Sequence, residues 1–193
     1  IKFYCEFRDN FIQSIDLIGG VYNSKIIFFI LNKIEKFICM NCHKLNLVSK
    51  GFNEYFLKKY PNLIITNYTN GIDDLYLNFD FKKNIKNLSS QKTILYVGNI
   101  GFGQALEKIL PYMAKQINSN YQFIIIGDGS SKKLLIDKVD DLNLKNIRIV
   151  SPMNREKLNT YYKDADILFL HLNDHESSRF VLPSKIFEYA ATN

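Results

Sequence analysis

The chain has 193 residues, of which 47% are hydrophobic and 14% aromatic, with a formal net charge of +6 and a pI of about 9.1. This is the composition of a globular protein with enough apolar mass for a core. Three cysteines exclude a disulfide framework, so we expect a reducing cytoplasm. The lysines are scattered and do not form a stripe with aromatic residues, which argues against nucleic acid as a partner.

The first 22 residues are irregular, and a helix is expected from Asn23 through Ile38. Its fully apolar run is about six residues long, far too short to cross a membrane. Two placements stay open: a buried helix, or a helix lying on a bilayer with Lys25, Lys33 and Lys36 at the lipid headgroups. The latter would give a peripheral contact at the inner face of the plasma membrane.

The segment Cys39-Met40-Asn41-Cys42-His43 has the spelling of a haem attachment site. It joins an apolar helix to an apolar strand and no export signal precedes it. We therefore interpret it as a packed helix end.

Strands are expected at 45–49 and 63–68, with a helix over 51–60 between them. A strand–helix–strand order implies parallel pairing with a right-handed crossover. Residues 77–91 are rich in Asn, Lys and Ser and have the composition of a linker. We predict one domain over 1–78, a linker over 79–91 and a second domain over 92–193.

The second domain alternates apolar strands with helices. Strands are expected at 93–97, 123–126, 147–150 and 166–170, with helices after each of the first three and after the final loop. Strands this apolar are buried on both faces, which predicts an α/β fold with a doubly wound parallel sheet. Ligands of such sheets bind beyond the carboxyl ends of the strands.

Two features at these strand ends are candidate ligand sites. The turn after the first strand carries Gly98, Gly101 and Gly103, which allow close backbone approach to a ligand. Tight strand-to-helix turns also use glycine for steric reasons alone.

The second feature is the segment Pro183-Ser184-Lys185, which begins a helix carrying Glu188 about one turn later. A helix start suits a diphosphate, to which Lys185 and Arg179 would add positive charge, while the Glu188 carboxylate suits a ribose diol. An ordinary capped helix with solvated charges is the alternative.

Four motifs in this order closely resemble glycosyltransferase family 4, in particular the bacterial surface-polysaccharide branch related to fucosamine transferases. They are Tyr96-Val97-Gly98-Asn99, Ile126-Gly127-Asp128-Gly129, Ala165-Asp166-Ile167-Leu168 and Leu182-Pro183-Ser184-Lys185-Ile186-Phe187-Glu188. The resemblance covers most of residues 45–193. It implies a GT-B fold with two Rossmann-like domains, both incomplete here, since the sequence begins without Met and ends inside an expected helix.

The resemblance also implies roles for individual residues. Glu188 matches the family's ribose-binding glutamate, whereas Phe180 stands where many members have another glutamate. Asn99 and Gln104 stand where many members carry an Arg and a Lys that neutralise the diphosphate. Arg179 and Lys185 are our substitutes for that pair, and Arg155 is a candidate for the base. The full donor set we expect is Gly98, Asn99, Gly101, Gly103, Gln104, Asp128, Arg155, Ser184, Lys185 and Glu188, with Arg179, Lys185 and Glu188 as catalytic residues.

We therefore expect an enzyme that moves a hexose-like sugar from a UDP- or GDP-sugar donor to a hydroxyl of a lipid-linked or polysaccharide acceptor. The resemblance implies retention of configuration, no metal ion and no further cofactor. We expect this part of the protein to be inactive alone. A GT-B nucleotide-sugar epimerase and a noncatalytic nucleotide-sugar-binding domain remain alternatives.

Overall fold

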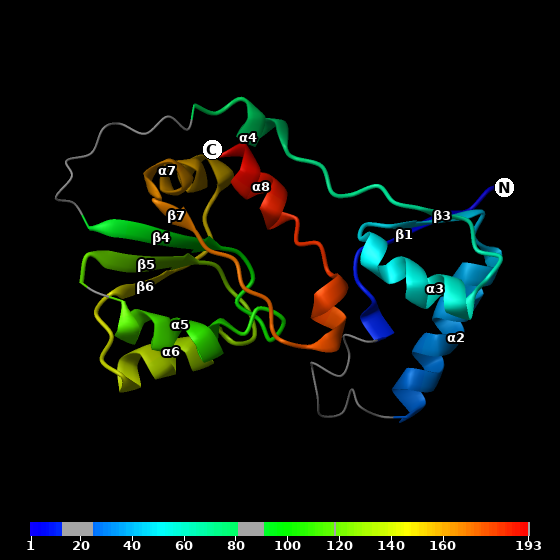
Figure 1. Cartoon of the computed structure of the whole chain (residues 1–193), viewed down its shortest axis with the longest axis horizontal. Coiled ribbons are helices and arrows are strands. Elements are labelled where there is room, and N and C mark those ends of the chain that lie inside the picture. The colour runs from blue at the N-terminus through cyan, green and yellow to red at the C-terminus, as the bar shows by residue number, and fades with distance from the viewer. Residues whose placement is uncertain (13–24, 81–90, 118, 193) are drawn as a thin grey trace. The chain divides into compact units, whose positions relative to one another are not determined.

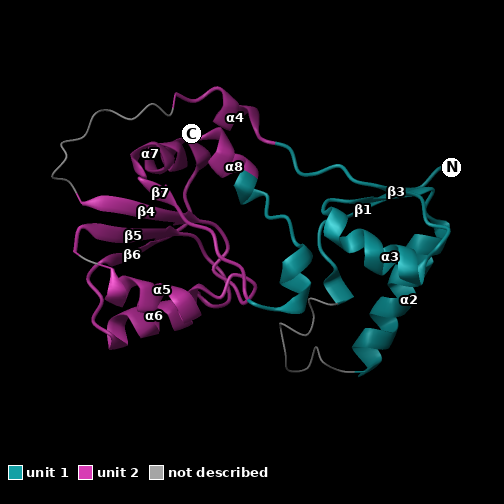
Figure 2. Ribbon diagram, viewed as in Figure 1, with its two compact units in different colours: residues 1–71, 174–186 teal, residues 72–173, 187–193 magenta. Residues whose placement is uncertain are grey.

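The protein is described by a computed structural model over residues 1–12, 25–80, 91–117 and 119–192. The chain forms two compact units (Figure 2). Unit 1 contains Ile1–Gly71 and Asp174–Ile186, and unit 2 contains Ile72–Asn173 and Phe187–Asn193. The boundary at residue 78 and the linker over 79–91 stay predictions, and most of that linker, 81–90, lies outside the described residues.

Unit 1 is built on a parallel sheet of three strands in the order β1-β2-β3: β1 (Tyr4–Phe7), β2 (Lys44–Leu47) and β3 (Ile65–Thr66). Its helical elements are α2 (Lys25–Asn41), η2 (Lys50–Phe52), α3 (Asn53–Lys59) and η3 (Glu176–Phe180). The expected parallel pairing of the two strands around the 51–60 helix is confirmed. The expectation of irregular structure over the first 22 residues is wrong at β1, where Cys5 and Phe7 alternate with Tyr4 and Glu6 at the period of a strand, and residues 13–22 lie outside the described residues.

The core of unit 1 alternates along the strands, since Leu45 and Leu47 are fully buried while Lys44 and Asn46 point to the other face. Phe52 and Phe56 from the helical elements pack against these leucines. Cys39 lies in the same cluster, and burial raises its pKa to about 12. The interpretation of residues 39–43 as a packed helix end is supported by this burial.

Helices α2 and α3 are joined by a buried charge. The side chain of Glu35 is fully buried, and its Oε1 accepts hydrogen bonds from Lys59 Nζ at 2.6 Å and from the Tyr60 hydroxyl at 3.0 Å. The Tyr55 hydroxyl adds a third donor, 3.3 Å from Oε2. A buried carboxylate needs this degree of pairing to offset its loss of hydration.

The outward face of α2 is apolar and exposed. The exposed residues recur at helical spacing over four turns and are 46–70% accessible: Ile26, Phe29, Ile30, Ile34, Phe37 and Met40. Lys25, Lys33 and Lys36 are exposed on the same helix. None of the described helices has the length and hydrophobicity that a bilayer crossing requires.

Unit 2 contains a parallel sheet of four strands in the order β6-β5-β4-β7 (Figure 1). The strands are β4 (Lys92–Val97), β5 (Tyr121–Ile126), β6 (Ile147–Val150) and β7 (Ile167–Leu168). The predicted doubly wound α/β sheet is confirmed, although β7 is shorter than the predicted 166–170.

Helices cover both faces of this sheet. α5 (Leu106–Gln116) and α6 (Lys132–Asp141) pack on one face around Tyr96 and Phe123, and α7 (Arg155–Asp164) packs on the other around Leu95 and Ile124. The remaining helices are α4 (Asp74–Leu77) and α8 (Lys185–Ala191), whose first two residues belong to unit 1. Asn154 caps α7 by accepting a hydrogen bond from the Lys157 amide.

Candidate functional site

The order β6-β5-β4-β7 reverses direction at β4, because the chain first adds strands on one side of β4 and then crosses to the other. In open α/β sheets such a reversal leaves a crevice at the carboxyl ends of the two strands concerned. Here those ends are Val97 of β4 and Leu168 of β7. The loops that follow them define the candidate site of unit 2.

The glycine turn after β4 is held by backbone contacts with the loop after β5. The Ile100 amide donates to the Asp128 carbonyl at 2.7 Å, and the Ser131 amide donates back to the Ile100 carbonyl at 2.9 Å. Gly129 has a φ of +153°, and a Cβ there would lie 2.5 Å from the Ile100 carbonyl oxygen. The two loops are therefore too close for any residue but glycine at position 129.

The backbone amides of the glycine turn have the arrangement of an anion-binding site. Within the described residues, the amides of Gly101, Phe102 and Gly103 donate to no protein acceptor. A Cβ on Gly103 would have no atom within 4 Å, so the space above it is open. Free amides in front of a helix start, here α5, form the type of concavity that binds phosphate groups.

Asn99 and Gln104, the two neutral side chains that stand where many members of the resembled family carry an Arg and a Lys, lie beside this turn. Asn99 Nδ2 donates to Gln104 Oε1 at 3.1 Å, so these two amides bind each other. Asp128 is paired with Lys132 at 3.7 Å. The predicted residues Gly98, Asn99, Gly101, Gly103, Gln104 and Asp128 are thus brought together at one edge of the sheet.

The loop after β7 is tied to the same turn. The Asn173 amide donates to the Gly103 carbonyl at 2.8 Å, and His171 Nδ1 lies 2.7 Å from the Gln104 carbonyl oxygen. Since a carbonyl only accepts, that ring nitrogen carries the proton, which leaves Nε2 as the potential acceptor of a neutral ring.

Glu188 is half-buried and faces a group of tyrosines. Its Oε2 accepts a hydrogen bond from the Tyr162 hydroxyl at 3.2 Å. Tyr162 is 3% exposed, and its ring lies edge-on to those of Tyr76 and Tyr189, with centroids 5.8 and 6.0 Å away. Burial raises the pKa of Tyr162, and the Glu188 charge raises it further, so the phenol remains a proton donor at neutral pH.

Tyr189 connects the Glu188 helix to the crevice. Its hydroxyl donates to the carbonyl of Phe169, the residue after β7, at 3.0 Å. Burial raises the pKa of Tyr189 to about 12. A hydrogen bond with the backbone of Val97, at the end of β4, offsets part of this rise. The same tyrosine therefore contacts both strand ends at which the sheet order reverses.

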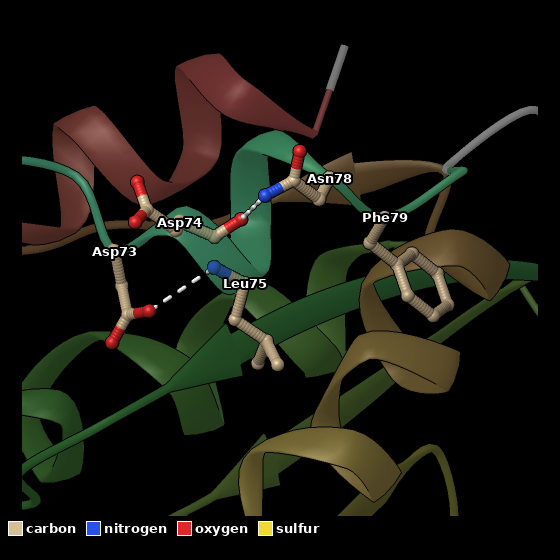
Figure 3. A pocket seen from close by; sticks show the side chains of 5 residues that line it. All are labelled: Asp73, Asp74, Leu75, Asn78 and Phe79. Carbon is tan, nitrogen blue, oxygen red and sulfur yellow. Dashed lines mark hydrogen bonds between the residues drawn. The ribbon is translucent and has the colours of Figure 1, made fainter.

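Arg155, the residue predicted near the base, forms an ion pair with Asp73 in which the side chains are 62% and 39% exposed. Next to this pair lies a hollow of about 430 Å³ (Figure 3), lined by Asp73, Asp74, Leu75, Asn78 and Phe79. Two carboxylates in its lining make it unsuited to a diphosphate.

The other predicted cations belong to unit 1. Arg179 is 70% exposed and lies 3.8 Å from Asp174, and Ser184 is exposed immediately before α8. Phe180, which stands in place of a glutamate, packs against Phe52 and covers Gly51. Lys185 is the first residue of α8.

One Asp-x-Asp triplet, Asp164-Ala165-Asp166, occurs in the sequence and has the sequence pattern of a cation-binding motif. Asp166 Oδ2 accepts from the Thr93 amide at 2.8 Å, at the amino-terminal edge of β4. That is the opposite edge of the sheet from the crevice. Among the described residues no group of three or more His, Cys, Asp or Glu side chains is arranged to hold a metal ion.

Sequence reasoning did not find Tyr76, Tyr162 or Tyr189 as neighbours of Glu188. Tyr162 lies in α7, the helix after the third strand of unit 2, and 26 positions separate it from Glu188. A hydrogen bond between such distant positions has no local sequence signal.

Comparison with known proteins identifies the family. The model of the family described as "Glycosyl transferases group 1" matches residues 78–178, just over half of the chain. The amylovoran biosynthesis glycosyltransferase AmsD of Erwinia amylovora is 22% identical over 148 residues, which cover 75% of this chain and 38% of AmsD.

Solved structures share the fold at low sequence identity. Sucrose-phosphate synthase from Thermosynechococcus elongatus has a TM-score of 0.65 at 14% identity, covering 98% of this chain and 48% of that one. HepE of Anabaena, in complex with UDP and glucose, has a TM-score of 0.60 at 10% identity, covering 86% and 45%. These neighbours are GT-B proteins, and the chain spans less than half of their length. With the family match and the parallel sheets, they show that the chain belongs to the group 1 glycosyl transferases and has the GT-B fold.

Proposed function

We propose that the protein is a glycosyltransferase and that unit 2 binds its nucleoside-diphosphate-sugar donor. The observation that carries this proposal is the double contact of Tyr189 with the ends of β4 and β7. It holds Glu188 at the edge where open α/β sheets bind ligands, next to the strand that leads into the glycine turn.

In this proposal the amides of Gly101, Phe102 and Gly103 and the start of α5 bind the diphosphate. Its departure from the sugar develops negative charge, which oriented N–H groups stabilise as it forms. Glu188 accepts hydrogen bonds from the ribose hydroxyls, and Arg155 covers the base. The roles of Arg179, Ser184 and Lys185 at the diphosphate rest on the sequence pattern at the start of α8, where both cations flank the helix start.

The acceptor in this proposal is a hydroxyl of a lipid-linked or polysaccharide chain, with retention of configuration and without a metal ion. The name of AmsD, an amylovoran biosynthesis protein, supports a role in surface polysaccharide synthesis. The exposed apolar face of α2 with its lysines supports a cytoplasmic enzyme in peripheral contact with the membrane. The fucosamine-transferase branch, the hexosyl donor and the inactivity of this part alone stay predictions.

Calorimetric titration with UDP, GDP and their hexose derivatives tests the donor site. We expect one nucleotide series to bind, and Glu188→Ala to weaken that binding at least about tenfold, since a hydrogen bond to a charged group contributes about 1.5–3 kcal/mol. Glu156→Ala removes an exposed carboxylate of α7 and serves as the matched control. Binding of neither series, or equal affinity in both variants, would overturn the proposal.

The hydrogen-bonded Asn99–Gln104 pair favours a second candidate, a domain that binds nucleotide-sugars without turning them over, because it supplies no positive charge for a leaving diphosphate. Incubation with the bound donor and analysis of products separates the candidates. Transfer to an acceptor supports the enzyme, a changed free nucleotide-sugar indicates an epimerase, and unchanged donor supports the binding domain.

A further inference from the structure

We infer that Tyr162 is a positioning residue that orients the Glu188 carboxylate and so determines how strongly the site distinguishes a ribose from a deoxyribose. This inference rests on the proposed function of Glu188 as the ribose ligand, and it adds a second residue and a selectivity that the motifs do not contain.

The first support is that the two oxygens of the Glu188 carboxylate differ in their hydrogen bonds. Oε2 of Glu188 accepts the Tyr162 hydroxyl at 3.2 Å. Within the described part of the chain, Oε1 forms no hydrogen bond, and Glu188 is only half-buried. One oxygen is thus anchored by the protein, and the other remains available to a ligand hydroxyl.

The second support is the rigidity of the donor. The Tyr162 ring is 3% exposed and is packed between Tyr76 and Tyr189 in edge-on contacts. A phenol fixed in this way loses little further freedom when it holds a partner, so it restricts the glutamate to a small range of orientations.

The third support is charge. The Glu188 charge acts on three nearby phenols: those of Tyr76 and Tyr162 on neighbouring elements, and that of Tyr189, the next residue of α8. Burial raises the pKa of each, and the nearby Glu188 charge raises it further, so all three stay neutral, and Tyr162 is the one that donates to the carboxylate. An ionised carboxylate beside neutral donors is a strong acceptor for a vicinal diol.

The test compares affinity for a ribonucleotide with affinity for its 2′-deoxy counterpart, using UDP with dUDP and GDP with dGDP. In the unaltered protein we expect the ribonucleotide of the binding series to bind about tenfold more tightly or better. In Tyr162→Phe, which keeps the ring, we expect this ratio to fall to threefold or less. In Tyr161→Phe, the adjacent position of the same helix, it should not change.

A merely structural role of Tyr162 would weaken both nucleotides alike and leave the ratio intact, and that result would overturn the inference. If Tyr162→Phe fails to fold, 4-fluorophenylalanine at position 162 fills the space of the hydroxyl without donating a hydrogen bond, and the same ratio is measured. Glu188→Gln separates the ribose role of Glu188 from the positioning role of Tyr162. If it leaves the ratio unchanged, the ribose role of Glu188 fails; if it lowers the ratio and Tyr162→Phe does not, only the role of Tyr162 fails.

Discussion

Lys138 of α6 donates a hydrogen bond from Nζ to the backbone carbonyl of Glu107 in α5, at 3.1 Å. This carbonyl is the one that the residue four positions later would normally bind. That residue is Pro111, which has no N–H. The lysine of one helix therefore satisfies the acceptor that the proline of its neighbour leaves without a backbone donor.

Replacing Lys138 by Met should consequently destabilise unit 2 by about 1–2 kcal/mol, because the Glu107 carbonyl is left without this donor. In a Pro111→Ala background the new amide can reach the same carbonyl, so the cost should fall below about 0.5 kcal/mol. Urea unfolding of the single and double variants measures both. An equal cost in the two backgrounds would contradict this explanation, and the exposed Lys133→Met, also in α6, is the control.

Glu35→Gln should destabilise unit 1 by about 2–3 kcal/mol. It preserves the shape of the side chain but removes the charge that Lys59, Tyr60 and Tyr55 bind. Breaking a fully buried pair costs about 3–5 kcal/mol, and the lower value is expected because a third of the Lys59 side chain is accessible. Thermal or urea unfolding checks this, with the exposed Glu54→Gln of α3 as the control. Similar losses in the two variants would show that Glu35 contributes nothing special.

The same cluster predicts a fall in stability at alkaline pH. Burial alone would lower the pKa of Lys59, but its hydrogen bonds to Glu35 and Tyr55 outweigh this effect and raise the pKa. For Tyr60, burial and the hydrogen bond to Glu35 both raise the pKa. Above about pH 10 the folded protein therefore holds more protons than the unfolded chain, so the free energy of unfolding decreases as pH rises. The stabilisation is fully present at neutral pH.

Urea unfolding between pH 7 and 11 measures this decrease. In Glu35→Gln the decline should be shallower, because the carboxylate that holds both protons is absent. A decline equally steep in the variant would place its origin elsewhere.

Two glycines of the candidate site should differ in how much a substitution by alanine destabilises the protein. Gly129→Ala puts a Cβ against the Asn99 side chain and the Ile100 carbonyl at a φ of +153°, so we expect a loss of at least about 2 kcal/mol. Gly103→Ala meets no atom within 4 Å and should change stability by less than about 0.5 kcal/mol.

Differential scanning calorimetry of both variants, followed by nucleotide titration of the stable one, checks this pair. If the diphosphate lies over Gly103, Gly103→Val should weaken nucleotide binding several-fold with little change in melting temperature. Unchanged binding would remove the glycine turn from the donor site.

Much of unit 2 could be predicted because its signals are local. The apolar runs of β4 and β5 identify strands buried on both faces, and the glycines at 98, 101 and 103 identify a tight turn. β6 has a similar apolar run but lies at the edge of the sheet and is only partly buried. The parallel sheet then places Gly98–Gln104 and Asp128 at one edge without any further information. β1 was not predicted although its apolar and polar residues alternate, because so short an alternating segment forms a strand only when another strand, here β2, pairs with it.

By itself, the sequence determined the α/β architecture with helices on both faces of a parallel sheet, the position of the glycine turn and the family motifs that end at Glu188. Only the tertiary structure decided that Glu35 faces inward to Lys59, that Lys138 reaches the carbonyl that Pro111 leaves open, and that Tyr162 holds Glu188. Periodicity and turn chemistry are properties of neighbouring residues, whereas each of these contacts joins positions more than twenty residues apart and depends on how the helices pack.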